Sequence, residues 1–533
     1  MSNDSSSISE QPEFSKLRKT LLPIHNYELK KFIPMSLMMM FILYIYTIFR
    51  DIKDPLVSRM SVGGDAAMLT FIKTYIVFPS SIIFMAIFIR LSNKLSKERL
   101  FYVITLFFIS FFVLFCLVLF PCTNLIHMNK DNILSWKESL KSVEYFGGFL
   151  QWLAPMIGNW SYTLFFVMAE LWGSVVLTAL FWQFVNMITK ITETKRFYPM
   201  FALIGNIGLL FSGLTVKLGA KQPTFAANLR MIGWFTLISG VALLVTYKWI
   251  QKYVLTDPRL YDPNQEVKKK KKANMGFFES MKFIFTTPYF LKLTMLMVGY
   301  GFAINLFEQI WKAQILVLPG SGVSKDDAAK IVQSIMGNLS IATGIITMIM
   351  TIVGVNVVQK FKWRTAALVT PISMLIICGI FFVLAMSGNV EAVHNTYLIA
   401  GITCLAKSAV FLSVYVGLFA NAIGKGVKYS LFDSTLQMAY MPLDSELKTK
   451  GQAAVSIIGG RLGKSGGALF VSTLIGAMKI DTPLDAIGII ASVFFVVVAL
   501  WILSVISLSG EYEQKMEECR NDKNQDQSLI EKA

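Results

Sequence analysis

The chain has 533 residues, of which 54% are hydrophobic and only 16% are charged, and its mean hydropathy is +0.57. Because soluble globular proteins are about one quarter charged, this composition excludes an ordinary soluble domain and favours an integral membrane protein. The formal net charge is +17. The basic residues lie mainly in tails and in loops between apolar stretches, which is typical of membrane proteins and does not indicate nucleic acid binding.

Apolar stretches recur along the chain at the length that spans a bilayer, about twenty residues each. About twelve are expected. The first six lie near residues 32–49, 69–89, 100–121, 161–181, 200–217 and 231–249, and the second six near 290–308, 332–358, 364–386, 395–423, 452–477 and 484–508. The sequence therefore predicts an all-α polytopic membrane protein.

A long polar segment separates the sixth and seventh spans and contains five consecutive lysines at 268–272. The fifth and eleventh spans also share a short pattern, GNIG and GRLG. Two related six-helix halves are typical of major-facilitator-like transporters. We therefore expect an N-terminal tail (1–31), a first half (32–249), a basic central loop (250–289), a second half (290–508) and a C-terminal tail (509–533).

Lysine and arginine are concentrated in alternate loops. The basic N-terminal segment, the loop before residue 100, the loop before residue 200, the central loop and the segments near 360 and 425–450 all fall on one side of the predicted spans. Cytoplasmic loops carry this excess of cations. Both termini are therefore expected to be cytoplasmic, and the polar first segment is expected to be a retained tail.

Cysteine and histidine residues are few. The five cysteines contain no CxxC pair and the three histidines are far apart, so neither a disulfide framework nor a metal site is expected. No nucleophile–base pattern stands out either. We predict that the protein is not an enzyme and uses no cofactor.

Charged residues inside the spans carry the functional signal, since each costs about 2.5–3.5 kcal/mol at mid-membrane on insertion scales. Arg461 and Lys464 lie in GGRLGKSGG, inside the eleventh span, and Lys73, Glu170 and Glu308 lie in three others. The cations are suited to phosphate binding. A structural alternative remains open, in which the glycines pack helices, the charges pair with one another, and Lys73 and Glu308 reach the membrane surface. A Walker A loop is excluded because the spacing is one residue short.

Two polar segments border predicted spans. RDIKD at 50–54 closes the first span and contains Arg50 and Lys53, which form either an interfacial gate or a solvated loop. The segment 425–451 contains Lys428 and Asp433, and it forms either a cytoplasmic gate or a connecting helix.

Several of these segments together resemble one known family. They are RDIKD (50–54), FIKTY (71–75), AELWGS (169–174), FWQFVN (181–186), KRFYPMF (195–201), LTDPRLYDP (255–263), INLFEQIWK (304–312), KYSLFD (428–433), AYMPLD (439–444) and GGRLGKSGGA (459–468). In content and order they resemble the non-mitochondrial ATP/ADP translocases, the nucleotide transporters of obligate intracellular bacteria and plastids.

The resemblance implies exchange of host ATP for ADP across the inner membrane by alternating access. It also implies that the charged residues of four motifs take part in transport, here Lys73, Glu170, Glu308 and Lys464. We expect Arg461 to join the cations at the phosphates, and Tyr75 or Phe166 to stack on the base. The expected partners are ATP, ADP and the lipid bilayer, and the protein is expected to work as a monomer.

Two positions depart from the family pattern, Ser456 and Val471. They leave open a second interpretation, in which the protein is a proton-coupled importer or an exchanger of a broader set of nucleotides. A third and more remote interpretation is a membrane nucleotide sensor that does not transport.

Overall fold

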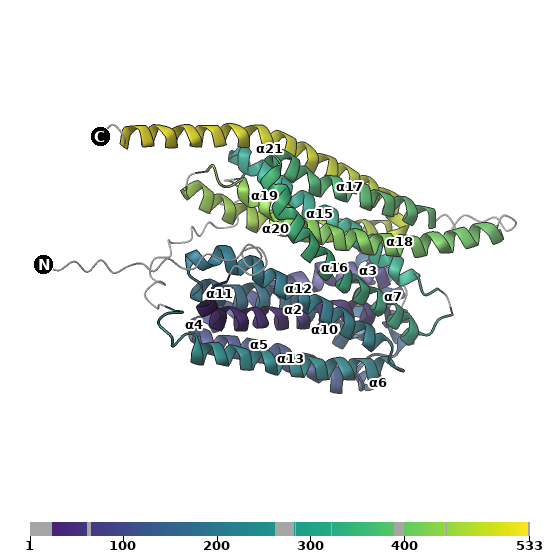
Figure 1. Cartoon of the computed structure of the whole chain (residues 1–533). Helices are drawn as coiled ribbons and strands as arrows, with labels where there is room; N and C mark the ends of the chain where they lie inside the picture. The colour runs from purple at the N-terminus through teal and green to yellow at the C-terminus, as the bar shows by residue number, and fades with distance from the viewer. Residues whose placement is uncertain are drawn as a thin grey trace.

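The computed structural model describes residues 24–60, 65–261, 282, 284–320, 322–388, 399–443 and 445–530, and within these ranges every regular element is helical (Figure 1). The lysine run and the polar N-terminal tail before residue 24 lie outside them. In a lipid environment a helix pairs every backbone group internally, which explains why such apolar sequences fold this way.

The first half is built from six membrane-crossing paths. They are α2 (Leu29–Ser58), then α3 (Asp65–Phe71), η2 (Ile72–Val77) and α4 (Phe78–Lys94) in line, α5 (Lys97–Leu114) with η3 (Phe115–Leu119), α10 (Trp160–Trp172) with η4 (Gly173–Phe181) and α11 (Trp182–Ile188), α12 (Ile191–Ala220) and α13 (Phe225–Tyr253).

The second half repeats this plan. Its helices are α15 (Pro288–Val317), α16 (Lys325–Lys360), α17 (Trp363–Gly388), α18 (Ile399–Val427) continued by η7 (Lys428–Phe432) and α19 (Asp433–Met438), α20 (Ser445–Met478), and α21 (Ile487–Ile530), which is preceded by η8 (Pro483–Ala486).

Eleven helices among the described residues are long and apolar enough to cross a membrane. The expected eleventh span corresponds to α20, whose Ser465–Met478 stretch is a shorter apolar segment. The prediction of a polytopic helical protein is confirmed. The boundaries differ, because α2 and α15 continue about two and a half turns past the predicted span ends and α21 runs on into the expected C-terminal tail.

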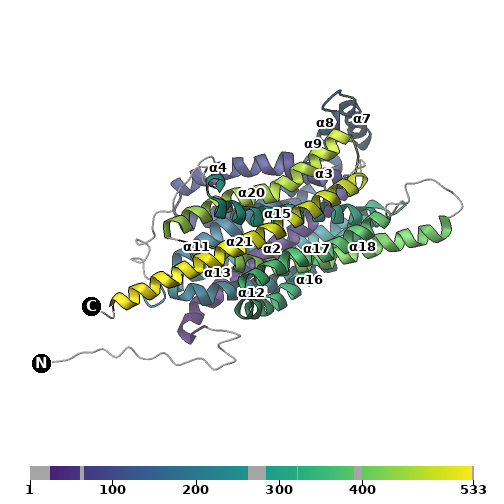
Figure 2. The same ribbon diagram turned by 90° about the horizontal axis from the view of Figure 1, so that it is seen from above.

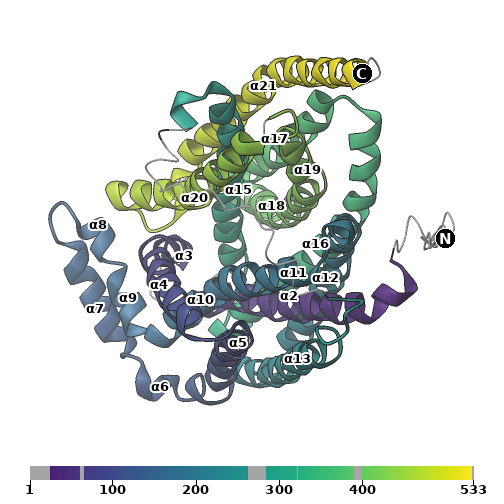
Figure 3. The ribbon, with the colours of Figure 1, turned by 90° about the vertical axis from the view of Figure 1, so that its left-hand side faces the viewer.

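The two halves lie side by side, with α2–α13 below and α15–α21 above in Figure 1 and in the end-on view of Figure 3. Helix α12 packs along α16, and α3 packs against α15 and α20. Helix α2 begins and α21 ends at the same end of the molecule (Figure 1). We call this the terminal end and the opposite one the far end.

Polar residues fix the starts of several helices. Ser96, Thr224 and Ser324 each accept a hydrogen bond from a backbone N–H in the first turn of α5, α13 and α16. Such N-caps satisfy groups that a helix leaves unpaired. They set where these three helices begin at the membrane boundaries.

Stacked aromatic rings hold α2 in the first half. The Phe49 ring lies 3.6 Å from that of Phe112 on α5 and 5.5 Å from that of Phe165 on α10, measured between centroids. Phe49 is fully buried. Its packing fixes the direction of the charged run that follows it on α2.

Four short helices, α6–α9, form an insertion at the far end that the sequence analysis did not predict (Figure 2). They are α6 (Thr123–Ile126), α7 (Lys130–Lys141), α8 (Gly147–Leu150) and α9 (Leu153–Gly158). Nζ of Lys137 and Nζ of Lys141 lie 3.9 Å and 3.5 Å from the carboxylate of Asp481 in the other half. The insertion thus joins the two halves at the far end.

Glycines on α20 allow it to lie directly against α15. A Cβ atom at Gly463 would stand 3.1 Å from Cα of Gly301, and one at Gly467 would stand 2.8 Å from Cβ of Asn305. Small residues at this spacing let membrane helices approach closely. The packing role that the sequence left open for these glycines is therefore confirmed.

Candidate functional site

A network of charged side chains crosses the boundary between the halves, and Lys53 on α2 is one of its centres. Its Nζ lies 2.8 Å from Oδ1 of Asp54 and 3.2 Å from Oε1 of Glu170 on α10. The same ammonium stands 4.0 Å from the ring centroid of Phe166. Two carboxylates and an aromatic face thus stabilise a lysine that is 1% exposed.

Two further ion pairs involve the second half. Nζ of Lys312 on α15 lies 2.7 Å from Oδ2 of Asp54, which makes a direct bridge between the halves. Nζ of Lys425 on α18 lies 3.1 Å from Oε1 of Glu308, one helical turn before Lys312. Buried charges require such partners, because removing ions from water is costly.

Arg50 and Asp51 form a third group with a serine of the other half. Nε of Arg50 lies 3.2 Å from Oδ1 of Asp51, and its Nη2 donates a 3.0 Å hydrogen bond to Oγ of Ser340 on α16. The Ser340 hydroxyl in turn donates to Asp51. This contact again connects α2 to the second half.

Lys73 differs from the other cations of the network. Among the described residues no carboxylate lies within ion-pair distance of its ammonium, although it interacts at longer range with Glu170 and Glu308. It is carried by the π-helical segment η2, in a path that is otherwise α-helical. Such π segments are frequent at functional sites.

The charges of this network favour an anionic ligand. Its described members comprise five cations and four carboxylates, from α2, η2, α10, α15 and α18. The side chains of Arg50, Glu170 and Glu308 are 23%, 29% and 21% exposed, so the network borders accessible space rather than a sealed core. An excess of lysine and arginine beside such a space is suited to phosphate groups.

The two halves carry opposite charges at corresponding places. On α2, Arg50 precedes Asp54 by one turn, and on α15 an acid, Glu308, precedes a lysine, Lys312, by one turn. Glu170 stands three residues before the π segment η4, and Lys425 stands three residues before the π segment η7. Where one half has a cation, the equivalent span of the other half thus has an acid, and the reverse. The charges of the two facing surfaces are therefore complementary.

Direct polar contacts between the halves, in the described part of the chain, lie at the level of this network or nearer the far end. They are Arg50–Ser340, Asp51–Ser340, Asp54–Lys312, Thr70–Gln309, Asn228–Gln333, Gln333–Val216, Lys330–Pro223, Phe225–Asp326, Arg59–Asp326, and the two lysines on Asp481. The protein is therefore closed at its far end in this conformation.

Several expected site residues come together here. Arg50, Lys53, Glu170 and Glu308 join the network, with Lys73 beside it, and Glu170 is paired with Lys53 as a membrane carboxylate requires. Of the two alternatives for 50–54, an interfacial gate or a solvated loop, the loop is excluded, because α2 continues to Ser58 and buries Asp51, Lys53 and Asp54.

The other expected site residues are less central. Lys428 and Asp433 form a 3.0 Å ion pair in the helical continuation of α18, so this segment is a helix. Phe166 is buried beneath Lys53, whereas Tyr75 is 39% exposed and stacks on Phe71. The side chains of Arg461 and Lys464 lie outside the described part of the structure.

Sequence analysis did not single out Asp51 and Asp54 as site residues, and it missed two lysines, Lys312 and Lys425. Both lie beyond the ends that apolar run length gave to their spans, and Lys425 was assigned to a cytoplasmic segment. Lys312 stands one turn after Glu308, in a helix that runs to Val317. A lysine spaced one turn from an intramembrane acid is the signal that identifies it.

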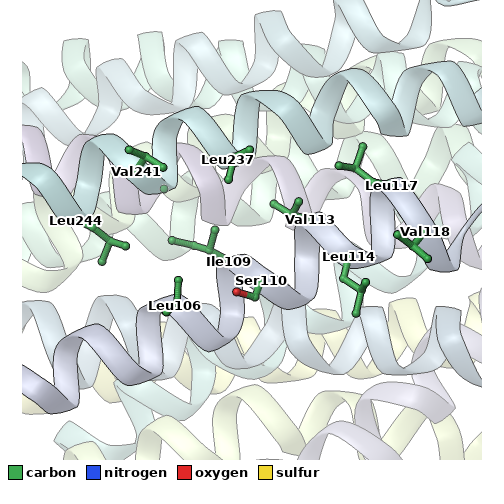
Figure 4. Close-up of a pocket in the computed structure, with 11 residues that line it drawn as sticks. Leu106, Ile109, Ser110, Val113, Leu114, Leu117, Val118, Leu237, Val241 and Leu244 are labelled. Carbon is green, nitrogen blue, oxygen red and sulfur yellow. The ribbon is translucent and has the colours of Figure 1, made fainter.

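Two grooves of the described structure lie away from this network. One of about 340 Å³ runs between α5, η3 and α13 (Figure 4). It is lined by Leu106, Ile109, Ser110, Val113, Leu114, Leu117, Val118, Leu237, Gly240, Val241 and Leu244. Since these residues carry no charge, the groove is not suited to a phosphorylated ligand.

Two helical halves around a polar network define a polytopic membrane transporter of major-facilitator-like fold. A D-xylose–proton symporter structure shares this fold, with a TM-score of 0.52 at 14% identity over 91% of this chain and 97% of its own. The family model of the TLC ATP/ADP transporter matches residues 7–512. The chain belongs to the TLC ATP/ADP transporter family.

Similar curated proteins come from bacteria and from a plant. ADP,ATP carrier protein 1 of Rickettsia conorii is 41% identical over 94% of this chain and 96% of its own length. ADP,ATP carrier protein 1 of Chlamydia trachomatis is 39% identical over 94% and 92%. The chloroplastic ADP,ATP carrier protein 2 of Arabidopsis thaliana is 37% identical over 92% and 76%.

Proposed function

We propose that this protein exchanges ATP for ADP across a membrane by alternating access. The observation that carries the proposal is the charged network between the halves, in a chain that belongs to the TLC ATP/ADP transporter family. Relatives named ADP,ATP carrier proteins match along almost their full length. No enzymatic step is needed for this activity.

The lysines that interact with Glu170 and Glu308, namely Lys53, Lys73 and Lys425, bind the phosphates in this account. Lys73 is the first contact, because it has no paired carboxylate among the described residues and is therefore available to an anion. Arg461 and Lys464, on the glycine-rich helix that packs against α15, complete the phosphate site. Tyr75 is exposed and provides an aromatic face for the base, whereas Phe166 supports Lys53 from below.

The acids of the network hold the cations while the site is empty. Glu170 pairs with Lys53, and Glu308 pairs with Lys425. When phosphates arrive, these lysines exchange a carboxylate partner for a phosphate partner. Arg50 and Lys53 lie on the helix that bridges the halves and take part in gating, and the Lys428–Asp433 pair steadies the helix that carries Lys425.

Orientation and assembly complete the proposal. Both termini face the cytoplasm, since the basic residues gather at the terminal end, and in a bacterium the membrane is the inner membrane. The conformation described above then faces the cytoplasm. The site lies between the two halves of one chain, so the protein works as a monomer within the bilayer.

Counter-exchange in cells producing the protein tests this function. Cells loaded with labelled ATP are diluted into buffer with ADP, with a panel of other nucleotides, or with none. Efflux that needs external ATP or ADP and resists a protonophore supports exchange. Uptake that a protonophore abolishes favours a proton-coupled importer. Rapid efflux of ATP when other nucleotides are present outside the cells indicates an exchanger of a broader set of nucleotides. No movement of nucleotide in either direction favours a sensor that does not transport.

A further inference from the structure

Lys312 occupies a position that the exchange reaction leaves unexplained. It lies on α15 about one turn from the far end of the helix and bridges to Asp54 on α2. We propose that Lys312 is a coupling residue, which prevents the empty transporter from reorienting and so enforces counter-exchange. This inference rests on the proposed ATP/ADP exchange.

The two members of the bridge are not equally dependent on it. Asp54 has a second cation, Lys53, at 2.8 Å on its own helix. Among the described residues, the carboxylate of Asp54 is the one within ion-pair distance of Lys312. Glu308 lies one turn away on the same helix but is paired with Lys425 at 3.1 Å.

Opening of the far end separates α2 from α15, because these helices belong to different halves. Asp54 keeps Lys53 during this movement and remains neutralised. Lys312 loses its ion-pair partner, the carboxylate of Asp54, and becomes an unpaired cation within the membrane. Such an unpaired charge is strongly unfavourable. The transition therefore needs a replacement anion at Lys312.

A phosphate group of the bound nucleotide is that anion. It approaches from the adjacent cation-rich site, where Lys53 lies 3.2 Å from Glu170 and both Lys73 and Lys312 interact with that same acid at longer range. With nucleotide present, Lys312 exchanges Asp54 for phosphate and the far end opens. Without nucleotide, the bridge between Asp54 and Lys312 holds the halves together.

The test compares two fluxes in proteoliposomes that contain the purified full chain and labelled ADP. One flux is exchange against external ATP, and the other is efflux into nucleotide-free buffer. For Lys312→Gln we expect the second flux to rise about tenfold or more, because the unpaired cation has been removed. Lys292→Gln is the matched control, since Lys292 lies on the same helix but pairs with Glu511 within its own half.

The outcomes distinguish coupling from simple binding. If Lys312→Gln loses exchange and its efflux into empty buffer stays at the wild-type level, Lys312 is only a phosphate ligand and the proposal is wrong. If that variant does not insert, Asp54→Asn tests the same bridge and is expected to leak as well, because Lys312 is then unpaired in both states. Failure of the wild type to exchange at all would instead contradict the proposed function.

Discussion

Glu308 and Lys425 face each other across α15 and α18, with Oε1 and Nζ 3.1 Å apart and about one fifth of each side chain exposed. The first half also has an ion pair between its first and fourth spans, Lys53 on α2 with Glu170 on α10, with the cation and the acid on opposite helices compared with this pair. Each half thus has its own internal ion pair beside the boundary, and the Asp54–Lys312 bridge lies between the two.

Removal of one member of the Glu308–Lys425 pair is expected to be worse for stability than removal of both. Lys425→Gln leaves a partly buried carboxylate unpaired, which costs about 1–3 kcal/mol in the free energy of unfolding. Glu308→Gln with Lys425→Gln is expected to recover at least half of that loss. Thermal unfolding of the purified single and double variants measures it, and additive losses would show that the two side chains are not coupled.

Lys73 is expected to be needed for transport but not for folding. Because its ammonium has no ion pair with the described residues, Lys73→Gln removes no structural bridge. Loss of one charge-assisted contact to phosphate predicts a fall in exchange rate of about ten- to a hundredfold. If Lys73→Gln inserts normally and loses exchange, a role of Lys73 in phosphate binding is supported. The control is Arg230→Gln, on the exposed face of α13. Full activity of Lys73→Gln would contradict phosphate binding.

The Arg59–Asp326 pair is expected to control closure of the far end. Arg59 joins the end of α2 to the start of α16, and its guanidinium lies 5.3 Å and 5.0 Å from the ring centroids of Phe120 and Phe225. The reporter is Asn228→Cys, at a buried position that becomes accessible when the halves part. In this background, Arg59→Gln is expected to increase labelling by a membrane-impermeant maleimide several-fold. Unchanged labelling would place the closure in the other far-end contacts.

Gly467 is expected to tolerate no large side chain. Gly467→Leu forces α20 away from Asn305 on α15, and such overpacking costs about 1–3 kcal/mol. We expect a lower unfolding temperature and loss of exchange, since the same helix carries Lys464. Gly488→Leu on α21 is the control, because no atom lies within 4 Å of a Cβ placed there. Equal effects at both glycines would rule out the packing role.

The sequence was sufficient to predict the helical spans, the family and five of the nine charged residues described at the network. The length of an apolar run does not predict where a membrane helix ends when the helix continues through charged residues that form ion pairs. The predicted first span stopped at residue 49 and the seventh at residue 308, although both helices continue through charged turns that are paired across the halves. Lys312 was missed for that reason, and Lys425 was missed because the predicted tenth span ended at residue 423.

Two other features depend on contacts that a single sequence does not display. The insertion α6–α9 consists of helices too short for a span pattern, and its role emerges only from the approach of Lys137 and Lys141 to Asp481. Phe166, one of the two aromatic residues expected at the base, has its ring centroid 4.0 Å from the ammonium of Lys53. Residue type alone did not distinguish it from Tyr75.

The stoichiometry of exchange tests the central claim most directly. Purified protein is reconstituted into liposomes filled with labelled ADP, and external ATP carries a second label, so that influx and efflux are counted together. The account predicts that one ADP leaves for each ATP that enters, with little efflux into nucleotide-free buffer and no effect of a protonophore between equal pools. Uptake of ATP into liposomes that contain no nucleotide, at a rate similar to that of loaded ones, would contradict it.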